Sequence, residues 1–288
     1  MPLNSHTHNL NSGKLYIVST PIGNLEDITY RAVRTLGEVD IIAAEDTRRT
    51  LKLLNHYNIK KKLVACHEHN EQEAAKGLID QMLQGQNVAL VSDGGAPLIS
   101  DPGFRLVSMA VESGLEAVPI PGACAAIAGL CGAGLPTDRF MFCGFLPKKQ
   151  GKLREALENV KDVQATLIFY ESPKRVLKVI EGMTQVLGDR TAVLAREITK
   201  IHEEFIRGTL SGIAEELNSR EGVKGECTLI VSGPEAQNPD LGSLDGLIRM
   251  EVAKGQLSAS KLSAKLAKQF GIEKKKVYAM ILALKDAK

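Results

Sequence analysis

The sequence predicts an α/β protein with two consecutive α/β domains, a cleft between them and a small C-terminal helical module. From Lys14 onward, short runs rich in valine and isoleucine alternate with amphipathic stretches, a pattern typical of strands joined by helical crossovers. Positions 88–91 are all apolar, as expected of a strand in a mostly parallel sheet that is covered on both faces. The chain has 288 residues, 44% hydrophobic and 24% charged, which suits two ordinary globular domains.

Five strands are expected in the N-terminal half, at 15–19, 40–44, 63–66, 88–92 and 116–119. Asn70, with Glu73 three residues later, predicts a capping box and a helix that runs to about Leu83. Asp101 followed by Pro102 predicts a second helix start, in which the Asp101 carboxylate accepts backbone N–H bonds.

The stretch 117–137 carries no charge, but prolines and glycines interrupt it. We therefore interpret it as a buried strand, a tight turn and a helix of small residues rather than as a membrane span. It leads into a second half with strands expected at 140–143, 166–170, 192–195, 204–207 and 227–231, and helices at 149–160 and 173–187. Two halves of similar size would enclose a cleft, where small ligands usually bind.

The domain boundaries follow from changes in composition. Residues 1–13 are polar, contain no export signal and predict a disordered arm. The α/β domains are expected at 14–120 and 121–235, and a linker at 235–242 leads to a basic module at 243–288. From position 256 the module has eight lysines against two acidic residues. Apolar residues at helical spacing on both sides of Gly271 predict two short amphipathic helices, and Leu247, Ile248 and Val252 ahead of them complete a three-helix pattern.

Several classes of site are disfavoured by what the sequence lacks. The five cysteines include no C-x-x-C pair, which argues against disulfides or zinc and favours a reducing, cytoplasmic compartment. The sequence has no G-x-x-x-x-G-K-[ST] loop and no G-x-G-x-x-G loop after the first strand, so a kinase, an NTPase or an ordinary dehydrogenase is not expected. His67 and His69 lack a third ligand at suitable spacing, and we expect no metal.

Three loops rich in glycine, proline and small residues follow predicted strands, at 20–24, 92–97 and 119–125. One such loop is usually only a tight turn. Three at the carboxyl ends of strands in one half favour a small-molecule site, because glycine lets a ligand approach the backbone.

The chain contains the motifs YIVSTPIGNL at 16–25, AEDTR at 44–48, HEHNE at 67–71, VSDGGAPLISDPG at 91–103 and PIPG at 119–122. Together they resemble the ribosomal RNA small subunit methyltransferase I family, a branch of the tetrapyrrole-methylase-like, class III S-adenosylmethionine-dependent methyltransferases. FYES at 169–172, AREITK at 195–200 and GE at 225–226 extend the resemblance over nearly the whole chain. Where the tetrapyrrole branch has a G-x-G-x-G loop, this chain has TPIGN at 20–24, which argues against a porphyrinoid substrate.

The resemblance implies S-adenosylmethionine bound between the two halves and methylation of the 2′-hydroxyl of a cytidine in the decoding region of 16S rRNA. It also implies a homodimer that acts on the small ribosomal subunit; neither DNA nor a membrane is expected as a partner. The last helices of the family resemble a helix-turn-helix that suits RNA, so the resemblance implies the same for the basic module. The cofactor site is expected at Pro21, Asp93, Gly94, Gly95 and Ala96, and family correspondence adds Ala123, Cys124, Tyr170, Ala195 and Cys227.

A ribose hydroxyl is weakly acidic, so its attack needs a proton acceptor. The candidates are carboxylates at predicted strand ends: Glu45, Asp46, Glu171 and Glu197. Each could equally be a helix cap or an ion-pair partner. We expect Asp46 and Arg48 to act on the RNA or on its hydroxyl.

Basic residues near these carboxylates, Arg49 and Lys200 among them, are natural anchors for RNA phosphates, with solvated ion pairing as the alternative. The basic module is expected to add Lys261, Lys265, Lys268, Lys274 and Lys275. Two other functions remain open. A small-molecule methyltransferase would use the cleft but not the basic module, and a non-enzymatic RNA-binding factor would use the module but not the cleft.

Overall fold

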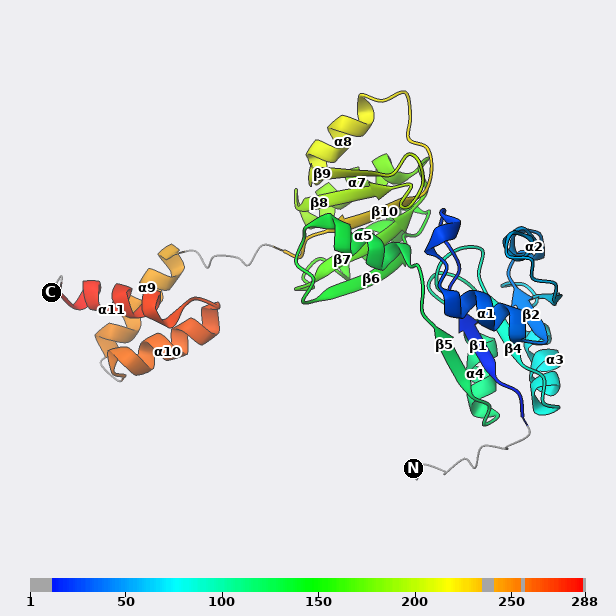
Figure 1. Cartoon of the computed structure of the whole chain (residues 1–288). Coiled ribbons are helices and arrows are strands. Elements are labelled where there is room, and N and C mark those ends of the chain that lie inside the picture. The colour runs from blue at the N-terminus through cyan, green and yellow to red at the C-terminus, as the bar shows by residue number, and fades with distance from the viewer. Residues whose placement is uncertain (1–11, 235–240, 255–256, 287–288) are drawn as a thin grey trace. The chain divides into compact units, whose positions relative to one another are not determined.

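The computed structural model describes residues 12–234, 241–254 and 257–286 of the chain. The chain forms two compact units, one that contains both α/β halves up to Ser232 and one that contains the C-terminal helices (Figure 1). Most of the predicted arm at 1–13 and of the predicted linker at 235–242 lies outside the described residues.

The first sheet contains five parallel strands in the order β3-β2-β4-β1-β5. Their bounds are β1 Leu15–Val18, β2 Ile41–Ala44, β3 Lys62–Ala65, β4 Val88–Val91 and β5 Ala117–Ile120. All five predicted strands are confirmed, with ends that differ by at most one residue.

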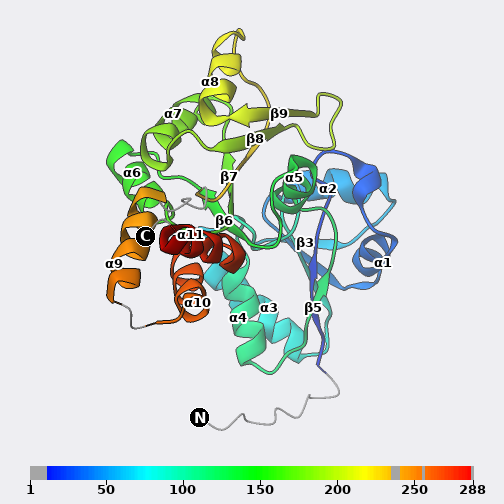
Figure 2. The same cartoon turned by 90° about the vertical axis from the view of Figure 1, so that its left-hand side faces the viewer.

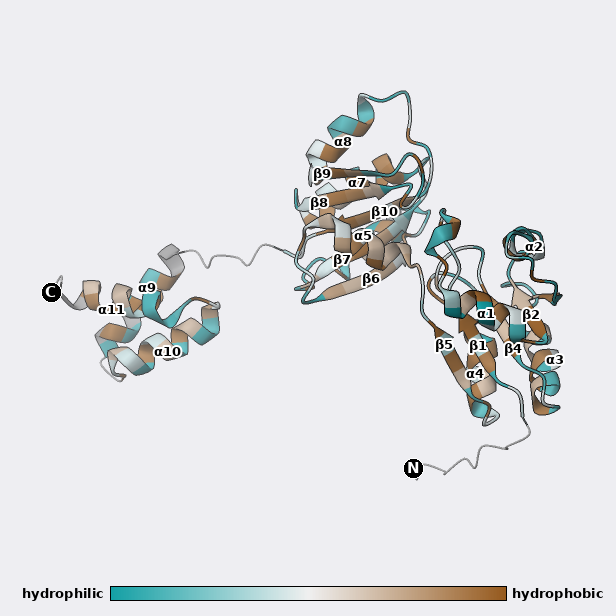
Figure 3. Cartoon of the chain, in the orientation of Figure 1, coloured by the Kyte–Doolittle hydropathy of each residue, from teal (hydrophilic) through white to brown (hydrophobic). Residues whose placement is uncertain are grey.

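Helices cover both faces of this sheet, as the apolar run at 88–91 predicted. One face packs against α3 (Glu71–Leu83) and α4 (Phe104–Glu112), and the other against α1 (Tyr30–Glu38) and α2 (Thr47–His56). Because side chains alternate along a strand, Ile41 packs against the first pair of helices and Ile42 against the second. The strands are accordingly the most hydrophobic part of this half (Figure 3).

The second sheet is mixed, in the order β6-β7-β10-β8-β9. Its strands are β6 Phe140–Phe145, β7 Thr166–Glu171, β8 Thr191–Arg196, β9 Glu204–Thr209 and β10 Cys227–Val231. The strand positions are confirmed, but the expectation of a mostly parallel sheet is wrong here, since only β6 and β7 pair in parallel. The connection between β8 and β9 is too short for a parallel crossover, so these two strands form a hairpin.

Helices also lie on both faces of the second sheet. Helix α5 (Ala125–Ala133) covers one face, and α6 (Gln150–Glu158), α7 (Val176–Leu187) and α8 (Leu210–Asn218) lie on the other (Figure 2). The small residues of α5 let it approach closely: a Cβ on Gly129 would lie 3.2 Å from the Thr228 side chain. The predicted small-residue helix is therefore confirmed.

The two predicted helix starts are capped differently from expectation. Asn70 does precede α3, but its side chain accepts from His67 N (2.8 Å) and donates to Ala65 O (3.0 Å). These bonds stabilise the turn between β3 and α3. The predicted capping box with Glu73 is therefore wrong, because the Asn70 side chain forms its hydrogen bonds within the turn and none with the N–H groups of α3.

Helix α4 begins at Phe104 rather than next to Asp101, and its cap comes from a distant residue. The buried carboxylate of Glu71 accepts hydrogen bonds from Gly103 N (3.0 Å) and Arg105 N (2.8 Å). Glu71 thus satisfies N–H groups at the start of α4, and the prediction that Asp101 caps this helix is wrong.

The C-terminal unit contains three helices, α9 Leu241–Lys254, α10 Ala259–Phe270 and α11 Lys274–Asp286, as predicted. Its core contains one apolar stripe from each helix: Leu244, Ile248, Leu262, Leu266, Val277 and Ile281. Gly271 ends α10 with φ +65°, a conformation that glycine adopts readily. No helix in the described ranges is long and apolar enough to cross a membrane.

Candidate active site

A cavity of about 680 Å³ opens at the carboxyl ends of β1 and β4, a size suited to a small molecule. The first half contributes residues 20–23 and 92–96, which include two of the predicted loops. The two loops pair with each other, because Thr20 N donates to Gly95 O (2.9 Å) and Gly95 N donates to Thr20 O (3.0 Å). The second half contributes Tyr170, Glu171 and Cys227, so both halves line the cavity.

The strand order explains why the cavity forms here. Strands β1 and β4 are neighbours, but the helices that follow them, α1 and α4, pack on opposite faces of the sheet. The chain therefore leaves the two strand ends in opposite directions. Such a switch point is the usual ligand site of an open parallel sheet.

Glycine backbone forms the wall of the cavity at the end of β4. A Cβ on Gly94 would lie 3.3 Å from Pro21 O, tighter than nine in ten real Cβ contacts. Gly95 has φ +92°, and its Cβ would lie 3.2 Å from the Ile22 side chain. Larger residues would fill space at this edge of the cavity.

Eight of the ten residues predicted to bind a cofactor line the cavity: Pro21, Asp93, Gly94, Gly95, Ala96, Cys124, Tyr170 and Cys227. Ala123 is outside the lining, although its carbonyl oxygen lies close to Gly95. Ala195 is fully buried in β8 and packs in the core with Ala126 and Leu130, so it cannot contact a ligand in the cavity.

Tyr170 connects the second sheet to the start of α5. Its hydroxyl accepts a hydrogen bond from Ala126 N (3.0 Å), and burial raises the pKa of the phenol. Its ring makes edge contacts with Phe142 and Phe145 at centroid distances of 4.9 Å and 5.7 Å. Tyr170 therefore stabilises the part of the cavity wall that the second half contributes.

Asp46 and Arg48, predicted to act on the substrate, lie outside the cavity lining and bind each other. The Asp46 carboxylate caps α2 by accepting from Arg48 N (2.9 Å), and it accepts two further bonds from the Arg48 guanidinium (3.0 and 2.8 Å). These bonds hold the pKa of Asp46 well below its usual range. A carboxylate so stabilised in its charged form is a poor proton acceptor, which favours the capping alternative.

Glu45 lies next to the cavity but outside its lining. Its carboxylate accepts from Asp93 N (3.4 Å), and burial together with the charge of Asp93 raises its pKa. Arg49, predicted to bind phosphate, lines the cavity and lies 3.3 Å from the Asp93 carboxylate.

Lys200 lines the cavity and binds Glu197, which lies outside the cavity lining. The Glu197 carboxylate accepts from Lys200 Nζ and from Glu226 N, both at 2.9 Å. These bonds, the one from Lys200 most of all, lower the pKa of Glu197. Lys200 also pairs with the Glu226 carboxylate at 2.9 Å. Glu197 is therefore poorly suited to accept a proton. Lys200 is held between two carboxylates, which does not suit the predicted phosphate contact.

Asp101 is the cavity residue that the sequence interpretation missed. Its carboxyl group is half-buried, and burial first, then the charge of Glu45, raises its pKa to about 6, against the opposing effect of a hydrogen bond from Ser92. The S-D-P-G motif predicted that Asp101 caps a helix. Because Glu71 accepts the hydrogen bonds from Gly103 N and Arg105 N instead, the Asp101 carboxylate is not used as that cap.

Asp101 also differs from the other carboxylates that line the cavity. Asp93 pairs with Arg49 (3.3 Å), Glu171 with Arg175 (3.4 Å) and Glu226 with Lys200 (2.9 Å). Asp101 forms no ion pair with any described cation. Of the four, it is the carboxylate that neutralises no neighbouring charge and can accept a proton without breaking an ion pair.

Glu171 is the predicted base candidate that does line the cavity. Its Oε1 accepts from Ser172 N (2.7 Å). Its buried Oε2 forms the ion pair with Arg175 (3.4 Å) but accepts no hydrogen bond within the described residues. A donor on a ligand could therefore form a hydrogen bond to Oε2 beside the Arg175 ion pair.

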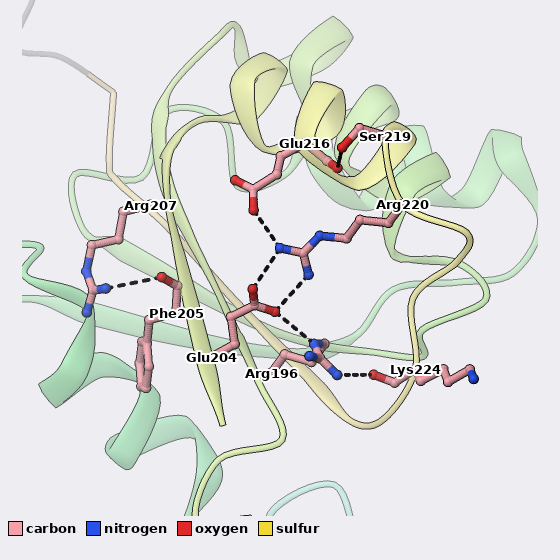
Figure 4. Close-up of polar contacts among 8 residues, drawn as sticks. All are labelled: Arg196, Glu204, Phe205, Arg207, Glu216, Ser219, Arg220 and Lys224. Carbon is pink, nitrogen blue, oxygen red and sulfur yellow. Dashed lines mark hydrogen bonds and ion pairs between the residues drawn. The ribbon is translucent and has the colours of Figure 1, made fainter. Parts of the chain in front are cut away.

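A charge network on the second sheet supports the loop that ends at Glu226 (Figure 4). The Glu204 carboxylate accepts two bonds from Arg220 (2.8 and 2.7 Å) and one from Arg196 (3.1 Å), and Arg220 foremost lowers its pKa to about 2. Arg196 also donates to Lys224 O (3.0 Å). The network ties β8, β9 and the loop before β10 together.

The lysines of the C-terminal unit that were predicted to contact RNA are exposed: Lys261, Lys265, Lys268, Lys274 and Lys275. Of these, Lys265 lies 3.9 Å from Glu251. Lys274 and Lys275 lie at the start of α11, where the helix dipole disfavours positive charge, so they do not stabilise the helix.

Comparison with known proteins agrees with the fold. The family profile of the tetrapyrrole (corrin/porphyrin) methylases matches residues 14–214. The chain is 48% identical over 275 residues to ribosomal RNA small subunit methyltransferase I of Haemophilus influenzae, covering 94% of this chain and 97% of the relative. It is 54% identical over 222 residues to the protein of that name from Halalkalibacterium halodurans, covering 77% and 76%.

Two solved structures share the fold at lower identity. Diphthine synthase superposes with a TM-score of 0.59 at 17% identity, covering 76% of this chain and 90% of its own. Uroporphyrin-III C-methyl transferase from Thermus thermophilus, complexed with S-adenosyl homocysteine, has a TM-score of 0.54 at 20% identity, covering 76% and 97%.

Proposed function

The chain belongs to the ribosomal RNA small subunit methyltransferase I family within the tetrapyrrole methylases, and from this membership we propose that it methylates the 2′-hydroxyl of a cytidine in the decoding region of 16S rRNA. The protein is an S-adenosylmethionine-dependent methyltransferase of small-subunit rRNA; the nucleotide and the oxygen atom are the proposed part. The observation that carries the proposal is the glycine-walled cavity with Asp101, a carboxylate without a cation.

The cavity fits S-adenosylmethionine by size and by donor set. Its glycine wall leaves space that a Cβ would occupy. Oε2 of Glu171 pairs with Arg175 but accepts no hydrogen bond from the described residues, so it can accept one from an ammonium or hydroxyl group. We propose that Pro21, Gly94, Gly95, Ala96 and Cys227 contact the cofactor.

When bound, the cofactor supplies an electrophilic methyl group on a sulfonium, and the protein supplies placement. The paired loops at Thr20 and Gly95 give the cavity a rigid wall, which keeps the reacting groups aligned. Both halves line the cavity, so residues of both can position the reacting groups.

We propose that the Asp101 carboxylate accepts the proton of the ribose 2′-hydroxyl as the oxygen attacks. A base with a pKa near 6 is ionised at neutral pH and still basic enough to assist. Glu45 contributes negative charge next to Asp101 and so raises its basicity.

The same proposal covers the cellular setting. An rRNA substrate places the reaction in the cytoplasm with the small ribosomal subunit. We expect a homodimer.

The test uses purified protein, labelled S-adenosylmethionine and three acceptors: unmethylated small ribosomal subunits, naked 16S rRNA and a tetrapyrrole. We expect label in the small-subunit rRNA, mapped by primer extension and nuclease digestion to one 2′-O-methylcytidine. Label in the tetrapyrrole alone would favour the small-molecule alternative. Binding of RNA with no transfer to any acceptor would favour the non-enzymatic alternative.

A further inference from the structure

A second hollow, with a volume of about 600 Å³, lies between α6 and α7 on the second half. Its lining is strongly basic: Lys148, Arg154, Lys174, Arg175 and Lys178 contribute positive charge, and Glu181 is the one acidic residue in that lining. We call it the α6–α7 groove. None of the motifs that suggested the cofactor cavity accounts for it.

Four of these five cations are available to a ligand. Lys148, Arg154, Lys174 and Lys178 are exposed, and they form no ion pair with any described residue. Arg175 is different, because it pairs with Glu171 (3.4 Å) and donates to Leu146 O (3.0 Å) and Pro147 O (3.1 Å). Unpaired like charges around one hollow repel each other, so the cluster does not stabilise the fold and suits a polyanion.

The lining of the groove and the lining of the candidate active site come from neighbouring segments of the chain. Residues 171–173 line the cavity, and the next two, Lys174 and Arg175, line the groove. Phe145 lines the cavity and Lys148, three residues later, lines the groove. Arg175 joins the two hollows directly, since it lines the groove while its guanidinium pairs with Glu171 in the cavity wall.

We propose that the α6–α7 groove binds backbone phosphates of the RNA strand next to the nucleotide that enters the cavity. The inference rests on the proposed function and deepens it by assigning a path to the flanking RNA. Lysine and arginine are the usual phosphate contacts, and such contacts set the position of a strand without reading its sequence. A polyanion that passes from the cavity to the groove meets four unpaired cations.

Phe145 lines the cavity and lies three residues before Lys148, which lines the groove. Its side chain is 58% exposed, and its ring makes an edge contact with Tyr170 at 5.7 Å, which leaves an exposed aromatic surface. Bases of single-stranded RNA stack on such surfaces without sequence preference. Phe145 is thus suited to support a base at the cavity mouth while phosphates contact the groove.

The test compares the full-length wild type with Lys148→Glu/Lys178→Glu and with the control Lys60→Glu/Lys62→Glu, which makes the same charge change at residues that line neither hollow. Binding of small ribosomal subunits is measured between 50 and 300 mM salt. Because each lost single-strand phosphate contact removes about 0.7 from the salt slope, we expect binding at least about tenfold weaker at 0.1 M salt and a slope lower by about 1.4. S-adenosylmethionine affinity, measured by calorimetry without RNA, should match that of the wild type.

A groove variant with wild-type RNA affinity and salt slope would overturn the inference, as would an equal loss in the control. If the double reversal unfolds the protein, Lys178→Gln alone is compared with Lys178→Arg, and only the arginine variant should keep RNA affinity. A wild type that methylates no rRNA would instead refute the proposed function, so the two failures can be told apart.

Discussion

At the residue scale, Asp101 combines features that are individually common. It lines the cavity, it lacks a cation, and its pKa is raised to about 6 by burial first and by Glu45 second. A carboxylate with an ion-pair partner, such as Asp46, is stabilised in its charged form and gains less from taking a proton. The two aspartates therefore differ in their ability to accept a proton because their surroundings differ.

We predict that Asp101→Asn lowers kcat by roughly 100- to 10,000-fold, the usual contribution of a positioned base. S-adenosylmethionine affinity should change little. In the wild type kcat should rise with pH through about 6 and then level off, because the carboxylate must be ionised to accept the proton. Steady-state kinetics between pH 5 and 9 measure this, with Asp138→Asn on an exposed loop as the control. Full activity in Asp101→Asn would exclude the assignment.

The same residue makes a prediction about stability. The folded-state pKa of Asp101 is raised from 3.8 to about 6, so its favourable contribution to folding is present below pH 4 and is lost as the pH rises through 6. Asp101→Asn removes a half-buried charge that no cation neutralises. At pH 8 the variant should therefore unfold at the same temperature as the wild type or higher, and calorimetric scans at pH 5 and 8 check this. A lower melting temperature at pH 8 would indicate a structural role.

Asp46 should behave in the opposite way, because it caps α2. We predict that Asp46→Ala lowers the melting temperature by a few degrees, while Asp46→Asn lowers it less, since asparagine caps helices about as well as aspartate. Turnover per folded molecule should fall far less than in Asp101→Asn. If Asp46→Asn abolishes turnover at unchanged melting temperature, Asp46 is the base after all.

At the element scale, the loop after β4 connects the fold to the chemistry. Its start pairs with the loop after β1 through Thr20 and Gly95, and its end carries Asp101. Because β1 and β4 are central parallel strands with buried side chains on both faces, these loops start from rigid positions.

We predict that Gly94→Val weakens S-adenosylmethionine binding by at least tenfold. Its Cβ would lie 3.3 Å from Pro21 O, and its methyl groups would extend into the cavity. Gly37→Val in α1 is the matched control, because a Cβ there meets no atom within 4 Å. Isothermal calorimetry gives both affinities, and circular dichroism checks the fold. Equal affinity in both variants would mean that the cofactor does not use this wall.

At the scale of the whole molecule, the two compact units divide the proposed work. The α/β unit contains the cavity and the α6–α7 groove, and the C-terminal unit presents Lys261, Lys265 and Lys268 on one exposed face of α10. A helix that exposes like charges on successive turns gains no stability from them.

We predict that Lys261→Glu/Lys268→Glu weakens binding to small ribosomal subunits and lowers the salt slope by about 1.4, for two lost phosphate contacts. S-adenosylmethionine affinity should be unchanged. Filter binding at several salt concentrations measures the slope, and Lys60→Glu/Lys62→Glu again serves as the control. An unchanged slope would assign the module another role, such as contact between protein subunits.

The strands, the glycine loops and the three C-terminal helices were predictable because each depends on a local pattern. Runs such as 88–91 are apolar over a few consecutive residues, and Gly271 ends a helix wherever the chain goes next. Local propensity and hydrophobic periodicity depend on the residues of one element, so they predict that element however the rest of the chain packs.

The sequence by itself determined the fold class, the strand positions and the loops that form the cavity edge. Only the tertiary structure decided which carboxylate is available there, because Glu71, 32 residues from Gly103, takes the capping bond and leaves Asp101 in the cavity. It also decided the antiparallel pairing of the second sheet and the burial of Ala195 in the core. These outcomes depend on contacts between distant segments, which no local pattern encodes.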